Sequence, residues 1–162
     1  MPALSISLNQ YFDCARKEIM NTNYNLPNFI NLSSQYGTSA LRLFLLKNMD
    51  KSQIDFNDII NVKAEIEYLI KAFENIGLDD ELEYQFVDKK VKLSRLLEDE
   101  KMVDFYQELF DLAKIMIEAG QVSKKHATTF LVFLNIILPN LASFLALKIQ
   151  LKNPIDYYSW DL

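Results

Sequence analysis

Apolar side chains recur every three or four residues through most of this chain, and this spacing constrains the fold more than any other feature of the sequence. The spacing is typical of helices with one buried face, and no stretch alternates between apolar and polar residues for long enough to predict a strand. Glycine and proline, which interrupt helices, number only 3 and 4 among the 162 residues. We therefore predict an all-α fold, an up-down bundle of about five helices with short connections.

Local start and stop signals set the expected bounds of the helices. Asn31, Thr38 and Ser123 have side chains that cap helix starts, and Gly37 and Gly120 follow expected helix ends. We expect a single turn over residues 32–36 and helices over 7–20, 38–51, 53–76, 80–97, 102–119 and 123–152. Pro139 is expected to kink the last of these helices, because it removes a backbone hydrogen-bond donor.

The length of the chain fits one domain over residues 1–162. Within it we expect an N-terminal helix and loop over 1–31, the bundle over 32–152 and a tail over 153–162. The single cysteine, Cys14, excludes an internal disulfide and indicates a reducing, cytoplasmic setting. Residues 130–147 are mostly apolar, but they include Asn135, Pro139, Asn140 and Ser143. A central bundle helix explains this run better than a membrane span.

One segment carries a resemblance to a known family. Tyr36-Gly37-Thr38-Ser39-Ala40-Leu41-Arg42-Leu43 resembles the Tyr-Gly-x-x-Ala-Leu-Arg-Leu segment of class Ia aminoacyl-tRNA synthetases, most closely the leucyl enzyme. In that family the segment begins the helical anticodon-binding domain. The segments that start at Asp55-Phe56, Val103-Asp104-Phe105-Tyr106 and Val122-Ser123-Lys124-Lys125 resemble later helix starts of the same domain. The resemblance covers the chain from about residue 20 onward and implies an anticodon-binding-domain-like bundle.

The departures from the family pattern bear on catalysis. The Lys-Met-Ser-Lys-Ser loop of the family corresponds here to Glu18-Ile19-Met20-Asn21-Thr22-Asn23, which lacks both lysines. Such lysines supply positive charge to the departing phosphates, and Asn or Thr cannot replace that charge. The histidine and both glutamates of the family's last helix are also missing around Pro139. These 162 residues contain no His-x-Gly-His element, so the resemblance implies a noncatalytic relative that needs no cofactor and no metal.

Basic residues cluster at two places and are the candidate RNA-binding residues. Lys89, Lys90, Lys92 and Arg95 lie on the helix expected over 80–97, and Lys124 and Lys125 begin the last helix. The functional interpretation is a set of phosphate contacts with tRNA. The alternative is a solvated helix face balanced by Asp88 and by the acidic run at 98–100. The net charge of −5 argues against tight, nonspecific binding of nucleic acid.

Three other residues have plain structural interpretations. Arg42 lies in an apolar segment, so we expect a buried or half-buried ion pair with Asp58 or Glu65. The lone histidine, His126, is expected at the surface or in a helix cap rather than as a general base. Cys14 is expected to be a buried, inert thiol.

Two functions from different classes follow from these observations. The first is a noncatalytic module that binds tRNA or another structured RNA and assists a full-length synthetase. The second is a protein-interaction or regulatory module derived from a synthetase, which the acidic composition favours. A third interpretation is an isolated part of a longer synthetase-like protein. None of these three involves a membrane.

Overall fold

The computed structural model describes residues 5–6, 28–79 and 87–149. This part of the chain is mostly helical, with seven α-helices, one 3-10 helix and four strands of two residues each. The all-α class is therefore confirmed, whereas the predicted number of about five helices is too low. Backbone contacts divide the chain into two compact units, residues 1–66 and 67–162. The predicted N-terminal part (1–31) and tail (153–162) fall almost entirely outside the described residues, so the single-domain division stays a prediction.

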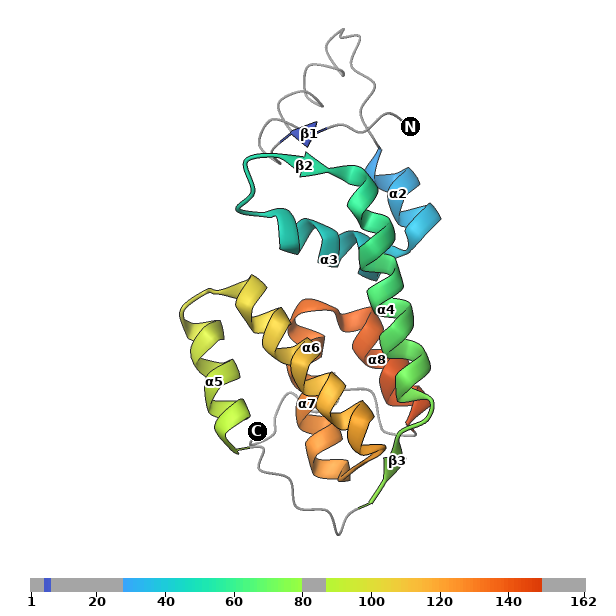
Figure 1. The fold of residues 1–162 in the computed structure, drawn as a ribbon, viewed down its shortest axis with the longest axis vertical. Coiled ribbons are helices and arrows are strands. Elements are labelled where there is room, and N and C mark those ends of the chain that lie inside the picture. Colours follow the sequence, from blue (N-terminus) through green and yellow to red (C-terminus); the bar gives the residue numbers. More distant parts are fainter. Residues whose placement is uncertain (1–4, 7–27, 80–86, 150–162) are drawn as a thin grey trace, which may run out of the picture. The chain divides into compact units, whose positions relative to one another are not determined.

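The first unit is built around α3 and the segment that follows it (Figure 1). Its described elements are β1 (Ser5–Ile6), α2 (Phe29–Tyr36), α3 (Thr38–Asn48), β2 (Ile54–Asp55), η1 (Phe56–Asp58) and the first half of α4 (Ile59–Phe73). β1 and β2 pair antiparallel, with Ile6 opposite Ile54. Phe44 and Phe56 are buried with their ring centroids 5.6 Å apart, so the core of this unit joins α3 to η1.

The sequence signals around α2 and α3 place both caps wrongly. Asn28, not Asn31, caps α2, and its Oδ1 accepts a hydrogen bond of 2.8 Å from the amide of Ile30. α2 therefore has 8 residues rather than a single turn. Gly37 follows α2 as predicted, with a φ of 92°, and Thr38 is the first residue of α3 instead of its cap.

The helix predicted from residue 53 begins later, at Ile59. The backbone of Ile54 is extended in β2, and its side chain is fully buried. Asp55 then accepts a hydrogen bond of 2.9 Å from the amide of Asn57, which starts the 3-10 turn η1. Burial of Ile54 and Phe56 in the core thus holds this segment out of the helix that its spacing predicts.

The second unit packs its helices in the order of the sequence. Its elements after α4 are β3 (Gly77–Leu78), α5 (Val87–Glu98), α6 (Met102–Ala119), β4 (Gln121–Val122), α7 (Lys124–Ile137) and α8 (Pro139–Lys148). α5 packs against α6, α6 against α7, and α7 against α8 (Figure 1). Phe73 and Phe130 stack with their centroids 5.4 Å apart, which joins the end of α4 to α7. β3 and β4 pair in parallel, with Gly77 opposite Gln121.

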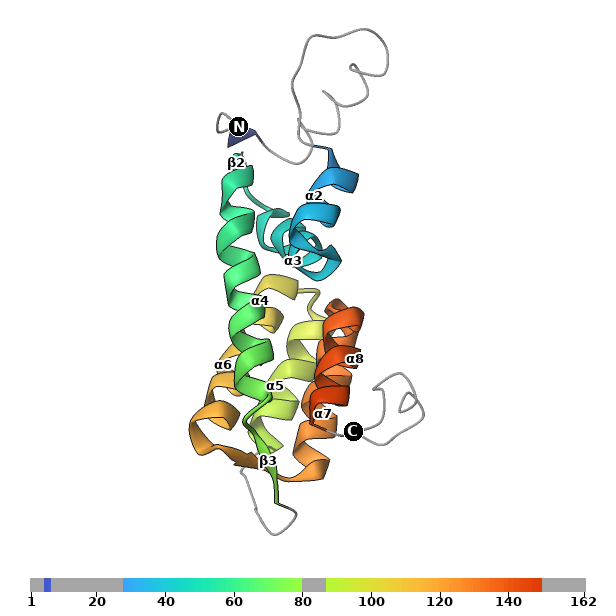
Figure 2. The same ribbon diagram turned by 90° about the vertical axis from the view of Figure 1, so that its right-hand side faces the viewer.

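The predictions for the last three helices had different outcomes. α6 spans the predicted Met102–Ala119, and Gly120 ends it in the left-handed conformation. Residues 130–147, expected to form one kinked helix, belong to two helices instead. Leu138 is non-helical and Pro139 is the first residue of α8, where a missing amide costs nothing. α8 folds back along α7 (Figure 2). Within the described ranges no helix has both the length and the apolar character that a bilayer crossing needs.

Candidate nucleic-acid interface

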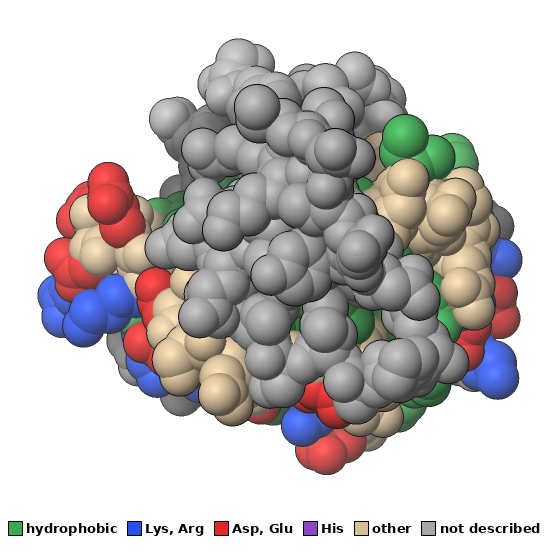
Figure 3. All heavy atoms as spheres, turned by 90° about the horizontal axis from the view of Figure 1, so that it is seen from above, with side chains coloured by type: hydrophobic (Ala, Val, Ile, Leu, Met, Phe, Trp, Pro, Cys, Tyr) green, Lys and Arg blue, Asp and Glu red, His purple; other side chains and the backbone are tan. Residues whose placement is uncertain are grey.

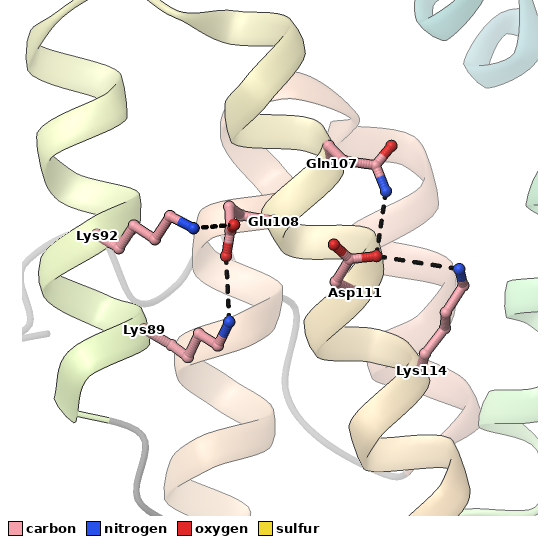
Figure 4. A network of polar contacts seen from close by, with 6 residues as sticks. All are labelled: Lys89, Lys92, Gln107, Glu108, Asp111 and Lys114. Atoms are coloured by element: carbon pink, nitrogen blue, oxygen red, sulfur yellow. Dashed lines mark hydrogen bonds and ion pairs between the residues drawn. The ribbon is translucent and has the colours of Figure 1, made fainter.

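Helix α5 carries the predicted basic cluster. Leu93, only 1% exposed, anchors this helix in the core of the second unit. Lys89 and Lys92 lie one helical turn apart on the side of α5 that faces α6 (Figure 4). Lys92 and Arg95 are exposed, and Lys90 is half-buried. The helix therefore buries one narrow apolar stripe and leaves cationic side chains accessible on either side of it.

Glu108 of α6 receives both lysines that face it. The Nζ of Lys89 donates to Oε2 of Glu108 at 3.3 Å, and the Nζ of Lys92 donates to Oε1 (Figure 4). Side-chain exposure is 16% for Glu108, 37% for Lys89 and 55% for Lys92. A shielded carboxylate is thus held between two ammonium groups that remain open to solvent. The sequence reasoning did not identify this carboxylate as a contact of the basic cluster.

The electrostatics of Glu108 follow from these contacts. The hydrogen bond from Lys92 holds the pKa of Glu108 below its ordinary value. Partial burial of the carboxylate opposes this shift, and Lys89 adds to it through its own hydrogen bond and charge. Glu108 is therefore ionised at neutral pH and neutralises part of the charge of the lysine pair.

The other two cations of α5 have no such partner. Lys90 and Arg95 form no ion pair with any described residue. The candidate acids at 98–100 lie at the end of α5, where all three residues are exposed. The predicted cluster thus contains two lysines engaged by Glu108 and two cations without a carboxylate contact in the described structure.

The second predicted pair, Lys124 and Lys125, lies on a different helix. They are the first two residues of α7, and both are exposed. Ser123 caps this helix as predicted, its Oγ accepting a hydrogen bond of 3.2 Å from the amide of His126. The same Oγ lies 2.8 Å from Nδ1 of His126. The structure thus places these two lysines at the start of α7 and the other four candidate residues, three lysines and Arg95, on α5.

His126, expected at the surface or in a helix cap, is the third residue of α7 and contacts the capping residue Ser123. Its ring is half-buried against the start of α7. Burial lowers the pKa of His126, and the positive charge of Lys125 lowers it further. The imidazole is therefore neutral at pH 7, and its contact with Ser123 has a structural role in the cap.

The first unit contains a polar cavity that no sequence signal indicated. It has a volume of about 440 Å³ and is lined by Lys47, Asn48, Lys51, Asp58, Asn61, Val62 and Glu65. Lys47 and Glu65 form an ion pair of 2.6 Å on its wall. Glu65 is thus the partner of Lys47, a pairing the sequence reasoning did not foresee. Arg42 is exposed, which corrects the prediction that its guanidinium would be buried or half-buried.

Charges of both signs share the visible surface. In the space-filling view, Lys and Arg side chains lie beside Asp and Glu side chains wherever described charged residues can be seen (Figure 3). Such a mixed surface limits long-range attraction of a polyanion and leaves local clusters such as α5 to provide contacts. No three His, Cys, Asp or Glu side chains in the described ranges are grouped as metal ligands would be.

Comparisons with protein-family models, with curated protein sequences and with solved structures found no match to this chain. The resemblance to class Ia synthetases therefore depends on the residues quoted above.

Proposed function

We propose that this protein is a noncatalytic RNA-binding module that contacts the phosphate backbone of tRNA or a similar structured RNA through α5. The observation that carries the proposal is the placement of four cations within seven residues of one helix, two of them free of any carboxylate contact among the described residues. Phosphate contacts from lysine and arginine supply most of the affinity in sequence-tolerant binding of this kind.

The resemblance to the leucyl-type anticodon-binding domain supports the same proposal. The helical class of the structure agrees with such a bundle. The absent loop lysines favour a role without amino-acid activation, and hence without a bound cofactor. In this proposal the module works in the cytoplasm during translation and assists a full-length synthetase.

The test is a titration of labelled total tRNA with the protein at low salt, with fluorescence anisotropy as the measure of binding. We expect wild-type protein to bind and the Lys90→Gln/Arg95→Gln variant to bind several-fold more weakly. The salt dependence of its binding constant should be shallower by roughly 1.5 logarithmic units per decade of salt, because two phosphate contacts are lost. Lys51→Gln/Lys71→Gln is the matched control, since it removes two exposed lysines elsewhere for the same change in net charge. Equal binding by the two variants, or no binding by wild type, contradicts the proposal.

A second candidate function is protein interaction, favoured by exposed apolar side chains on α8. Phe144 and Leu147 lie one turn apart and are 42% and 73% exposed. In this candidate function the surface binds a full-length synthetase. Purified leucyl-type synthetase should then co-elute with wild type but not with Leu147→Ser, while tRNA binding stays absent from both. Asn140→Ser, on the same exposed side of α8, is the control.

A further inference from the structure

The contact between Glu108 and its two lysines has the geometry of an occupied anion site. Each carboxylate oxygen accepts a hydrogen bond from a different ammonium group, one from Lys89 and one from Lys92. A phosphate group likewise presents two oxygens that separate cationic donors can bind together. The position of the two ammonium groups is therefore already suited to one bidentate anion (Figure 4).

The energetics allow another anion to replace the carboxylate. Glu108 is shielded, but the ammonium groups of both lysines lie in solvent, where water and salt screen an ion pair and the lysine side chains lose freedom by holding it. Both lysines are more than a third exposed, so a ligand can reach them from solvent. Displacing Glu108 costs an incoming phosphate chain little, provided that the chain makes further contacts with Lys90 and Arg95.

We propose that Lys89 and Lys92 form a phosphate subsite that the chain's own Glu108 occupies until an RNA backbone phosphate displaces it. Glu108 is then an intramolecular competitor that lowers the affinity for RNA. This inference rests on the proposed RNA-binding function and assigns it a built-in limit on binding strength. An RNA backbone displaces the carboxylate because its neighbouring phosphates make additional contacts. A single anion has no such contacts and must compete with the carboxylate for the two lysines alone.

Glu108→Gln tests the competition because it removes the charge and keeps the shape. We expect this variant to bind tRNA roughly fivefold more tightly at low salt, a fold-change that corresponds to about 1 kcal/mol for the competing ion pair. Asp111→Asn is the matched control. It lies on the same helix and makes the same change in net charge, but its partners are Gln107, at 3.1 Å, and Lys114, at 3.9 Å. The control should change the affinity by less than about twofold.

A third variant locates the effect. In Glu108→Gln combined with Lys89→Gln and Lys92→Gln, the gain in affinity should disappear, because the subsite itself is gone. If Glu108 serves only to fasten α5 to α6, Glu108→Gln should instead lower the thermal unfolding midpoint without strengthening binding. Binding by Glu108→Gln that equals that of Asp111→Asn, while wild type still binds, overturns the inference and leaves the proposed function intact.

Inorganic tripolyphosphate separates failure of the subsite from failure of the function. Tripolyphosphate is titrated into the protein, and binding is monitored through the nuclear magnetic resonance signals of the lysine ammonium groups. A response at Lys89 and Lys92 that is stronger in Glu108→Gln supports the subsite even if tRNA does not bind, in which case only the proposed function fails. No response of these lysines in either protein overturns the subsite.

Discussion

At the scale of single residues, Glu108 and His126 make the stability of the protein depend on pH. Both pKa values are lowered in the folded state, that of Glu108 by Lys92 first and that of His126 by burial first. As the pH falls below the ordinary pKa of each group, the unfolded chain binds more protons than the folded one, so the stability of the folded protein decreases as the pH decreases. The contribution of His126 is complete above pH 6.5 and lost as the pH falls below it. That of Glu108 is lost in a separate step below pH 4.5.

Urea unfolding midpoints measured across this pH range check the two steps. His126→Gln should flatten the upper step and leave the lower one, and Glu108→Gln should weaken the lower step alone. An unchanged upper step in His126→Gln would show that another group titrates there.

The lysines of α5 could be found from the sequence, but Glu108 could not. Lys89 and Lys92 can be recognised because they belong to a basic run on one predicted helix. Glu108 lies 16 residues after Lys92, on a different helix. A contact at this separation in the sequence cannot be predicted from helical spacing. Only the packing of α5 on α6 brings the carboxylate between the two ammonium groups.

At the scale of elements, the glycines after α2 and α6 end these helices by their backbone conformation. Gly37 has a φ of 92° and Gly120 a φ of 71°, and nothing lies within 4 Å of a Cβ added at either position. The cost of alanine there is therefore a backbone cost alone. We expect Gly37→Ala to destabilise the protein by about 1–3 kcal/mol, because its φ and ψ lie outside the left-handed helical region. Gly120→Ala should cost about 1 kcal/mol.

Gly77→Ala is the control for this pair. Its added Cβ would lie 3.6 Å from Cγ of Gln121, an ordinary contact, so we expect a change of less than about 0.5 kcal/mol. Urea denaturation of the three variants gives the order. If Gly37→Ala is as mild as Gly77→Ala, the backbone of Gly37 is not the constraint described above.

The predicted bounds of a helix agree with the structure where no tertiary contact overrides the local start and stop signals. α6 was predicted residue for residue because Gly120 marks its end without competition. The start of α4 was placed six residues too early, since the burial of Ile54 and Phe56 overrides their helical spacing. Pro139 was predicted to kink one helix, whereas α7 ends at Ile137 and α8, which packs back onto it, begins at Pro139.

At the scale of the whole molecule, the chain divides into two compact units. We therefore expect substitutions in different units to change the free energy of unfolding independently. Asn48 belongs to the first unit; its buried side chain donates a hydrogen bond of 2.7 Å to the carbonyl oxygen of Phe44. Asn48→Ala should cost about 1–2 kcal/mol. Ser123→Ala removes the α7 cap in the second unit and should cost about 1 kcal/mol. The costs should add in the double variant to within about 0.5 kcal/mol.

Urea or thermal unfolding of the single and double variants measures this sum. Asn57→Ala, an exposed position, is the control for Asn48→Ala and should change stability by less than about 0.5 kcal/mol. A coupling energy above that level would mean that the two sites report on one cooperative structure.

Local patterns in the amino-acid sequence were enough to predict the helical class, the two glycine stops, the cap at Ser123 and the basic run on α5. Each of these depends on the spacing or type of residues that are close together in the chain, so each can be read locally. The tertiary structure alone decided the start of α4, the separation of α7 from α8, the polar cavity of the first unit and the pairing of Glu108 with the lysines. These features arise because burial and charge pairing join residues that are far apart in the sequence, and such contacts leave no local pattern.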